Sequence, residues 1–409
     1  MKKKLRIGIL FGGRSGEHEV SLVSAASILK AIDRSKYEVV PIGIDKQGRW
    51  LSGDEAQRLL GNNAAPVPLA ADPDAEFAAA AAVLRSGEPL SIPPLPASKL
   101  VVKSLQVSAP TELAQPVNPL TAALDIIFPV LHGTFGEDGT IQGLLELADI
   151  AYVGSGVLGC SCAMDKDAMK RLFAAAGLPQ TPYVSLLRND WRADPKRATR
   201  LIEKSLTYPL FVKPANLGSS VGISKVHNRA ELAPAIDLAA SFDRKIVVEQ
   251  GVGGPGVKPR ELEIAVLGND APEASVVGEI VPNKEFYDYE SKYADSEQPS
   301  IPIIPTKLSK AETRQIREMA VAAFRACDCA GLARVDFLME PARDSKGRKI
   351  KKPRILLNEI NTMPGFTSIS MYPKLWQASG LSYKKLIDRL IELALERHRE
   401  KQETRFTKP

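Results

Sequence analysis

The stretch "FVKPANLGSSVGISKV", residues Phe211 to Val226, joins two apolar, strand-like runs through a loop rich in glycine and serine. Within it, the letters from 218 to 222 match the G-x-S-x-G motif of hydrolases. That motif needs a helix directly after the serine, and an acid and a histidine farther along. The residues after Ser220 read as a strand, and the only later histidines are His227 and His398. The sequence therefore argues against a catalytic serine here.

A phosphate-binding loop explains this stretch better. A flexible turn between two strands exposes successive backbone N–H groups and two hydroxyls, which suit anionic oxygens. Lys213, at the end of the first strand, adds a positive charge. No G-x-x-x-x-G-K-[ST] motif occurs in the chain, so this is not a Walker loop.

The segments around this loop alternate between strand and helix patterns. Residues 5–11 and 37–45 read as buried strands, and apolar residues at helical spacing lie between them. This βαβ order predicts a parallel sheet. A strand-rich tract follows at about 206–290, and a helix and two further strands complete the pattern. We expect an α/β fold with more than one domain, because 409 residues exceed one compact core.

The composition is that of an ordinary soluble globular protein, with 44% hydrophobic and 25% charged residues. A net charge of +6 suits small anionic ligands, and no basic block demands a nucleic-acid partner. No apolar run approaches the roughly 18 residues of a membrane span. We therefore expect a cytoplasmic protein that binds neither nucleic acid nor membrane.

Two further features of the sequence do not indicate a functional site. The four cysteines form two C-x-C pairs without a nearby histidine, so reduced and mostly buried thiols are expected in preference to zinc. Residues 61–120 contain 13 alanines and 10 prolines, which predicts a loop-rich insertion with at most one helix. The sequence assigns no role to that insertion.

The residues near the C-terminal strands predict a metal site. Arg334 and Asp336 are two apart, as are Glu359 and Asn361, so each pair points to one face of its strand. Two such strands side by side would bring together two carboxylates and an amide oxygen, which suit Mg²⁺ bound with nucleotide phosphates. We prefer this to a surface salt bridge, because the flanking residues are apolar and a buried carboxylate needs a partner.

Two other motifs leave alternatives open. Glu17 and Glu19 lie where they could serve a site or merely complement a helix N-terminus. His132 follows a strand, where α/β sheets place ligands, yet its neighbouring glycines could simply form a turn. A third motif, "GSGVLG" from Gly154 to Gly159, matches the dinucleotide fingerprint. It lacks the acidic residue about twenty positions on, so that function is not expected.

Several long segments occur in a fixed order between residues 7 and 376: "FGGRSGEHEVS", "HGTFGEDGTIQG", "YVGSGV", "MDK", the stretch quoted first, "FYDYESKY", "ARVDF" and "NEINTMPGFTSISMYPKLW". In these the chain resembles the D-alanine–D-alanine ligases of the ATP-grasp superfamily, in their longer form. The resemblance implies a three-domain ATP-grasp fold. Its parts would be an N-terminal α/β domain (1–165), a central domain (166–250) and a C-terminal domain (251–409) with the metal and oxyanion site.

The activity that the resemblance implies is the ATP-dependent joining of two D-alanines through a D-alanyl phosphate, for peptidoglycan precursors. Two Mg²⁺ or Mn²⁺ ions and a homodimer belong to the same expectation. The Lys-Tyr pair at 292–293 points to D-alanine as the acceptor, with a D-alanine–D-lactate or D-alanine–D-serine ligase as the alternative. The turn before Glu261 and the basic hairpin at 343–354 are longer than the family pattern, and the hairpin has no assigned function.

The resemblance also implies individual roles. The residues expected to bind ATP are Lys166, Lys213, Ser219, Ser220, Glu249, Gln250, Val252, Glu261 and Lys292. The residues expected to bind the amino acids are Glu17, His132, Lys292, Ser370 and Met371. The expected metal ligands are Asp336, Glu359 and Asn361. The residues expected to take part in catalysis are Glu17, Ser219, Tyr293, Arg334 and Gly365. Arg334 and the Gly365 backbone N–H would stabilise the oxyanion.

Overall fold

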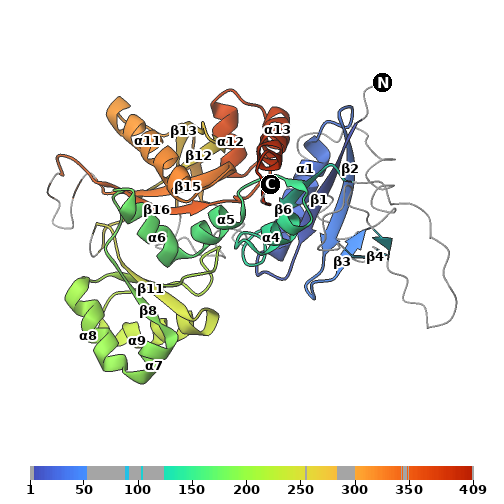
Figure 1. Cartoon of the computed structure of the whole chain (residues 1–409). Coiled ribbons are helices and arrows are strands. Elements are labelled where there is room, and N and C mark those ends of the chain that lie inside the picture. The colour runs from blue at the N-terminus through green and yellow to red at the C-terminus, as the bar shows by residue number, and fades with distance from the viewer. Residues whose placement is uncertain are drawn as a thin grey trace, which may run out of the picture.

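Three β-sheets with covering helices carry the expected site residues (Figure 1). The computed structural model describes residues 4–52, 88–91, 103–104, 124–253, 256–282, 300–341, 343, 348 and 350–407. The mixed helix and strand content confirms the predicted α/β class. The domain boundaries at residues 165 and 250 stay predictions.

The N-terminal sheet is built on parallel strands, as the βαβ pattern predicts. Its parallel strands, in spatial order, are β2 (Tyr37–Ile44), β1 (Leu5–Gly12), β6 (Ile126–Val130) and β7 (Ala151–Tyr152). Seven of the eight residues of β1 are buried, as expected for a strand covered on both faces. Antiparallel strands extend this sheet beyond β2: β3 (Trp50–Ser52), β4 (Glu88–Ser91) and β5 (Lys103–Ser104).

The insertion at 61–120 is therefore not all loop, because β4 and β5 come from it. The single helix that the sequence allows there, at 74–85, lies outside the described residues. The helices that pack on this sheet are α1 (His18–Ala31), α4 (Thr140–Leu147) and α13 (Tyr383–Gln402), whereas α5 (Val157–Met164) contacts α4, α6 (Lys166–Ala175) and strand β16 (Ile355–Asn361) of the C-terminal sheet. The sequence did not predict α5, which begins within the "GSGVLG" motif.

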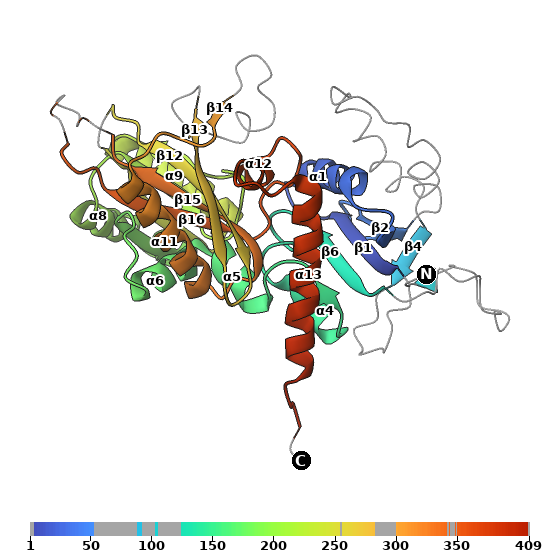
Figure 2. The ribbon, with the colours of Figure 1, turned by 90° about the horizontal axis from the view of Figure 1, so that it is seen from above.

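The C-terminal helix α13 joins two parts of the molecule. Its Leu386 and Leu390 belong to one apolar cluster with Ile9 and Phe128 of the N-terminal sheet and Leu332 of the C-terminal sheet. Figure 2 shows α13 running between these two parts. Helix α13 therefore packs against both the N-terminal and the C-terminal sheet.

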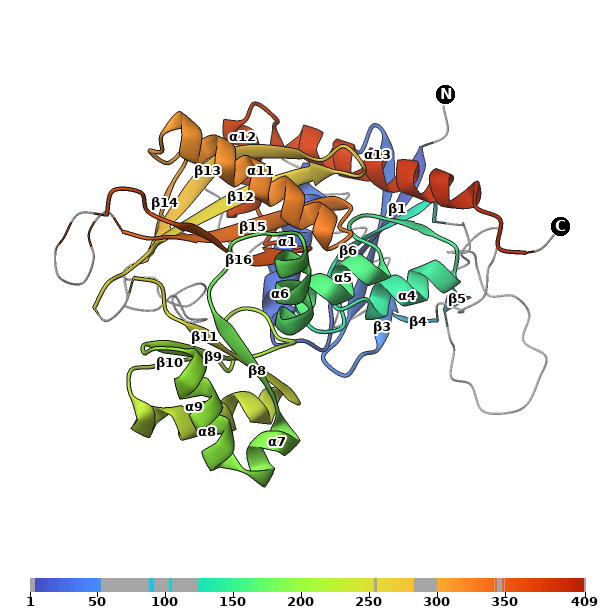
Figure 3. The ribbon, with the colours of Figure 1, turned by 60° about the vertical axis from the view of Figure 1, so that its left-hand side comes forward.

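The central unit is a small antiparallel sheet with helices on one side (Figure 3). Its strands, in spatial order, are β10 (Ser224–Val226), β9 (Leu210–Pro214), β11 (Lys245–Gln250) and β8 (Tyr183–Leu187). Its helices are α7 (Arg188–Ala193), α8 (Pro195–Ser205) and α9 (Arg229–Phe242). Trp191, Ile202 and Ile236 of these helices are buried with the sheet in one core.

The prediction of a strand-rich tract at 206–290 was incomplete, because α9 interrupts it. The Asn228 side chain caps this helix by accepting a hydrogen bond from Ala230 N at 3.0 Å. Leu232, Ile236 and Ala239 then recur at helical spacing and are buried.

The C-terminal sheet is antiparallel and supplies the largest share of the site. Its strands, in spatial order, are β14 (Ile301–Ile303), β13 (Glu273–Val281), β12 (Arg260–Gly268), β15 (Gly331–Met339) and β16 (Ile355–Asn361). The helices beside it are α11 (Lys310–Ala326), α12 (Met371–Ala378) and α6 (Lys166–Ala175). Met169 and Phe173 of α6 pack in one cluster with Ile316 and Phe324 of α11. The helix that carries Lys166 is thereby anchored to the C-terminal core.

The cysteines and the helices meet two other expectations. All four cysteines are free, and three of them are buried, which confirms the predicted thiols. Within the residues that the structure describes, none of the helices combines the length and the apolar character of a membrane span.

Candidate active site

One cavity of about 1110 Å³ is lined by residues from all three sheets. It brings together every expected site residue that the structure describes: Glu17, His132, Lys166, Lys213, Ser219, Ser220, Glu249, Gln250, Val252, Glu261, Arg334, Asp336, Glu359, Asn361, Gly365, Ser370 and Met371. Lys292 and Tyr293 lie outside the described residues.

The loop between β9 and β10 forms one wall of the cavity. Ser219 and Ser220 have left-handed backbone angles, with φ of 50° and 61°. Such angles cost roughly 1–2 kcal/mol per non-glycine residue, so the surrounding contacts must hold them. One contact comes from Lys166, whose Nζ donates to Leu217 O at 2.6 Å. The strand–loop–strand arrangement of the quoted stretch agrees with the prediction, although the second strand begins only at Ser224.

A buried carboxylate lies between two lysines beside this loop. Glu249 is 3% exposed, and its two oxygens lie 3.3 Å from Lys170 Nζ and 3.0 Å from Lys213 Nζ. Burial alone would raise the pKa of Glu249, but the two lysines outweigh it and lower that pKa to about 2. Burial lowers the pKa of Lys170, which Glu249 only partly offsets.

Sequence reasoning missed Lys170, although a signal existed. Lys166 and Lys170 are four residues apart, which places them on one face of α6. Lys170 is fully buried and does not line the cavity, whereas Lys166 and Lys213 do. Gln250 follows Glu249 at the end of β11. Its Oε1 accepts from Thr207 N at 3.0 Å, so this side-chain oxygen already has a protein partner.

The carboxylate cluster on β15 and β16 has the predicted arrangement. Asp336 is the register partner of Glu359, and Arg334 is the partner of Asn361. Register partners in an antiparallel pair lie on one face. Arg334 Nε and Nη2 donate to the two oxygens of Asp336 at 2.7 and 2.6 Å, and Asn361 Nδ2 donates to Asp336 Oδ2 at 3.1 Å.

Glu263 of β12 is a further member of this cluster. It is the register partner of Asp336, and its Oε2 lies 3.1 Å from Arg334 Nε. Burial would lower the pKa of Arg334, but Asp336 and Glu263 outweigh this effect and raise the pKa. The alternation of Glu261 and Glu263 along β12 could have indicated that both face the cavity.

The donor set on these strands fits a hard cation. Two carboxylates and an amide oxygen gather on one face of the sheet, beside the loop that suits phosphate. Across the described ranges, no group of three or more His, Cys, Asp or Glu side chains has the arrangement of a metal site. A cation bound here would therefore use the amide oxygen of Asn361 and ligands from the nucleotide in addition to the carboxylates.

The opposite wall contains Glu17, for which the sequence left two alternatives. Glu17 occupies the N-cap position of α1 but its side chain makes no capping hydrogen bond. Instead its carboxylate accepts a hydrogen bond from Ser219 Oγ and packs against Gly133 and Gly218. A Cβ atom on either glycine would lie 2.5 or 2.7 Å from Glu17 Oε2. The carboxylate thus faces the cavity and the loop between β9 and β10.

His132 fixes the segment around Gly365 to the N-terminal unit. Its Nδ1 lies 2.8 Å from Met363 O and its Nε2 lies 3.0 Å from Ser24 Oγ, which also accepts from Phe366 N at 3.3 Å. Burial lowers the pKa of His132, partly offset by the charge of Glu17. A neutral ring that donates from Nδ1 and accepts at Nε2 satisfies all of these contacts.

Glu137 supports the same segment, and sequence reasoning did not select it. Its Oε2 accepts from Met363 N at 2.8 Å and its Oε1 accepts from Gly133 N at 3.0 Å. Burial and the nearby Glu17 raise the pKa of Glu137 to about 8. Beyond this segment, Ser370 and Met371 stand at the start of α12, where backbone N–H groups favour an anionic ligand.

Comparisons with known proteins agree with this geometry. Two family models match the chain: D-ala D-ala ligase N-terminus over residues 6–155 and D-ala D-ala ligase C-terminus over residues 172–392. A D-alanine–D-alanine ligase of Bacillus cytotoxicus is 46% identical over 404 residues, covering 99% of both chains.

Two solved structures extend the likeness to the fold. The D-alanine-D-alanine ligase of Coxiella burnetii is 36% identical with a TM-score of 0.74, covering 98% of this chain and 96% of that one. VanG D-Ala:D-Ser ligase of Enterococcus faecalis is 32% identical with a TM-score of 0.75, covering 96% and 100%.

The fold and the cavity define an ATP-dependent carboxylate–amine ligase with the ATP-grasp fold. Within that class, the chain belongs to the D-alanine–D-alanine ligase family.

Proposed function

We propose that this protein joins two D-alanines at the described cavity, with ATP as the energy source. The observation that carries the proposal is the gathering of all described candidate residues around one cavity, with lysines on one wall and a carboxylate cluster on another. The product would be the dipeptide of peptidoglycan precursors. A cytoplasmic location and a homodimer belong to the same proposal.

The lysines and the loop would bind the nucleotide. Lys166 and Lys213 would contact phosphates, with Ser219 and Ser220 in the covering loop. Glu249, Gln250 and Val252 would line the base, and Glu261 would meet the ribose. The charge of the buried trio supports this, because two lysines and one carboxylate leave one positive charge for an anion.

The metal ligands in this proposal are Asp336, Glu359 and Asn361, and two Mg²⁺ or Mn²⁺ ions would be held there together with phosphate oxygens. When bound, the ions would neutralise the charge on the phosphates. Arg334 is positioned by Asp336 and Glu263, so its guanidinium is fixed beside these ligands before any substrate arrives. A fixed donor of this kind costs no reorganisation during the reaction.

The chemistry proceeds in two steps. A carboxylate oxygen of the first D-alanine attacks the γ-phosphorus of ATP, and ADP leaves. The amine of the second D-alanine then attacks the acyl carbon of the D-alanyl phosphate, and the dipeptide, phosphate and one proton are released. Arg334 and the Gly365 N–H would stabilise the tetrahedral oxyanion.

The two substrates would occupy opposite ends of the cavity. Glu17 would hold the first ammonium group beside His132. Ser370 and Met371 would bind the second carboxylate at the start of α12. Lys292 and Tyr293 would close over the site, which keeps water from the acyl phosphate.

The first experiment measures coupled ADP release with ATP and Mg²⁺. We expect release with D-alanine, none with L-alanine, and the D-alanyl-D-alanine dipeptide as the product. Mixed incubations of D-alanine with D-lactate or D-serine test the alternative acceptors. D-serine is included because the chain is similar to VanG, a D-Ala:D-Ser ligase. A D-lactyl or D-seryl product would reject D-alanine as the preferred acceptor, and no ADP release at all would reject the proposed reaction.

Variants on one hairpin test the site itself. Arg334→Ala should lower kcat by about 10²–10³, as for the loss of an oxyanion donor, and Glu359→Ala should nearly abolish turnover. The matched control is Arg354→Ala, at the residue directly before β16. Arg354 is paired with Glu340 at 2.6 Å, is largely exposed and does not line the cavity. Full activity in either site variant would overturn the assignment.

A further inference from the structure

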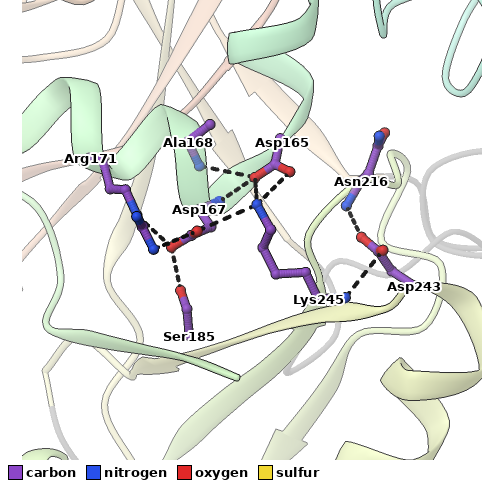
Figure 4. A network of polar contacts seen from close by, with 8 residues as sticks. All are labelled: Asp165, Asp167, Ala168, Arg171, Ser185, Asn216, Asp243 and Lys245. Carbon is purple, nitrogen blue, oxygen red and sulfur yellow. Dashed lines mark hydrogen bonds and ion pairs between the residues drawn. The ribbon is translucent and has the colours of Figure 1, made fainter. Parts of the chain in front are cut away.

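A polar network outside the cavity connects the segments that carry its phosphate-side residues (Figure 4). We call it the root network, and its members are Asp165, Asp167, Ala168, Arg171, Ser185, Asn216, Asp243 and Lys245. None of these residues lines the cavity. Their contacts nevertheless converge on Lys166 and on the start of the glycine- and serine-rich loop.

The side chain of Lys245 holds the first turn of α6. Its Nζ lies 2.8 and 3.0 Å from the two oxygens of Asp165 and 3.4 Å from Asp167 Oδ2. These two aspartates flank Lys166 in the sequence. Asp165 also caps the helix by accepting from Ala168 N at 2.9 Å. The turn from which Lys166 projects is therefore tied to β11.

The backbone of the same residue holds the root of the loop. Lys245 O accepts from Ala215 N at 3.0 Å, and Ala215 O accepts from Lys166 N at 3.0 Å. Asp243 completes the connection, because its Oδ2 accepts from Asn216 N at 2.7 Å and its Oδ1 accepts from Lys245 N at 3.2 Å. Asn216 is the last residue before the loop that begins at Leu217.

The two segments belong to different parts of the fold. Helix α6 packs its apolar side on the C-terminal core, whereas the loop extends from the central sheet. Lys166 reaches the loop directly through two hydrogen bonds, from N to Ala215 O and from Nζ to Leu217 O. The Lys245 side chain adds a charged connection between the first turn of α6 and the central sheet. The Lys245 and Asp167 side chains are only 19% and 7% exposed, so solvent and salt screen this ion pair less than a surface pair.

We propose that Lys245 is a positioning residue for phosphate binding. It fixes the distance between Lys166 and the loop, so that a triphosphate meets both at once. Positioning of this kind matters because a misplacement of about 1 Å, caused by a mutation far from the reacting atoms, can lower the reaction rate by as much as about two orders of magnitude. The inference rests on the proposed roles of Lys166 and the loop.

The test compares two ligands that differ only in their phosphates. Binding of a non-hydrolysable ATP analogue with Mg²⁺, and of adenosine, is measured by calorimetry for the wild type and for Lys245→Met. We expect the affinity for the analogue to fall about tenfold, while the affinity for adenosine changes by less than about twofold. Lys245→Arg should recover part of the loss, because a guanidinium can donate to both aspartates.

Arg171→Met is the matched control. Arg171 contacts Asp167 in the same network at 3.0 Å but is 71% exposed, and in Figure 4 its polar contacts go to Asp167 and not to Asn216 or Asp165. Both affinities should stay at the wild-type level in this variant. An equal loss for the analogue and for adenosine in Lys245→Met would show general damage and overturn the inference, as would no loss at all. A wild-type protein that binds the analogue but releases no ADP with D-alanine would overturn the proposed function and leave this comparison interpretable.

Discussion

The buried trio of Glu249, Lys170 and Lys213 leads to a prediction about stability. Glu249→Gln removes the only carboxylate of the trio and leaves two lysines facing each other. Their side chains are 0% and 11% exposed, so water cannot readily screen them. Removing one partner of a buried ion pair costs about 3–5 kcal/mol. We expect a loss of about 4 kcal/mol in the free energy of unfolding of the central unit.

Lys170→Met should lower the free energy of unfolding much less than Glu249→Gln does. Glu249 keeps Lys213 at 3.0 Å, and one buried ammonium group no longer has to be stripped of water. We expect a change of about 1 kcal/mol or less, because the lost attraction and the saved desolvation oppose each other. In the double variant only one cation remains, so it should be about 1–2 kcal/mol more stable than Glu249→Gln alone.

The assay is urea unfolding followed by the fluorescence of Trp191. This residue is buried in the core of the central unit, so it reports that unit. The background carries Trp50→Phe and Trp376→Phe, which removes the other two tryptophans. The reasoning is refuted if Glu249→Gln costs no more than Lys170→Met, or if the two changes add to within about 0.5 kcal/mol.

Three further predictions concern other parts of the molecule. Gly218→Ala places a Cβ atom 2.7 Å from Glu17 Oε2, so ADP release should show kcat/KM lowered about tenfold or more; wild-type kinetics would contradict the contact. Burial lowers the pKa of His132 below 6.5, so below that pH the unfolded chain binds a proton that the folded chain excludes. The urea concentration at the midpoint of unfolding should therefore be lower at pH 5.5 than at pH 7. In His132→Gln the midpoint should depend less on pH; the same pH dependence as in the wild type would contradict the role of His132. Ser309→Ala removes the capping box of α11 with Glu312 and should cost about 1 kcal/mol in urea unfolding, whereas an unchanged midpoint would refute the role of the cap.

The strands and the carboxylate cluster could be predicted because their signals are local. Asp336 and Glu359 each lie in an apolar strand, and the period of two fixes the face on which they appear. The register that pairs them then confirmed what the sequence could only suggest. The quoted loop could be interpreted in the same way, since its chemistry lies within sixteen residues.

The missed residues depend on distant partners. Lys170 meets Glu249, Glu263 meets Arg334, and Glu137 meets Met363, each more than seventy residues away in the chain. Along the sequence these residues look like ordinary charged positions of a helix, strand or turn. Local spacing can indicate the face on which Lys170 or Glu263 lies, but the partner of each residue is set only when distant segments of the chain come together.

The contact between Ser219 and Glu17 has a thermodynamic consequence. It joins the loop beside Lys166 and Lys213 to the carboxylate on the opposite wall. Coupling between two binding sites is reciprocal. If a ligand bound at the loop changes the affinity for a ligand at Glu17 by some factor, the ligand at Glu17 changes the affinity for the ligand at the loop by the same factor. We therefore expect the affinity for a ligand at Glu17 to depend on whether a ligand occupies the loop that contains Ser219, and the reverse dependence to be equal in size.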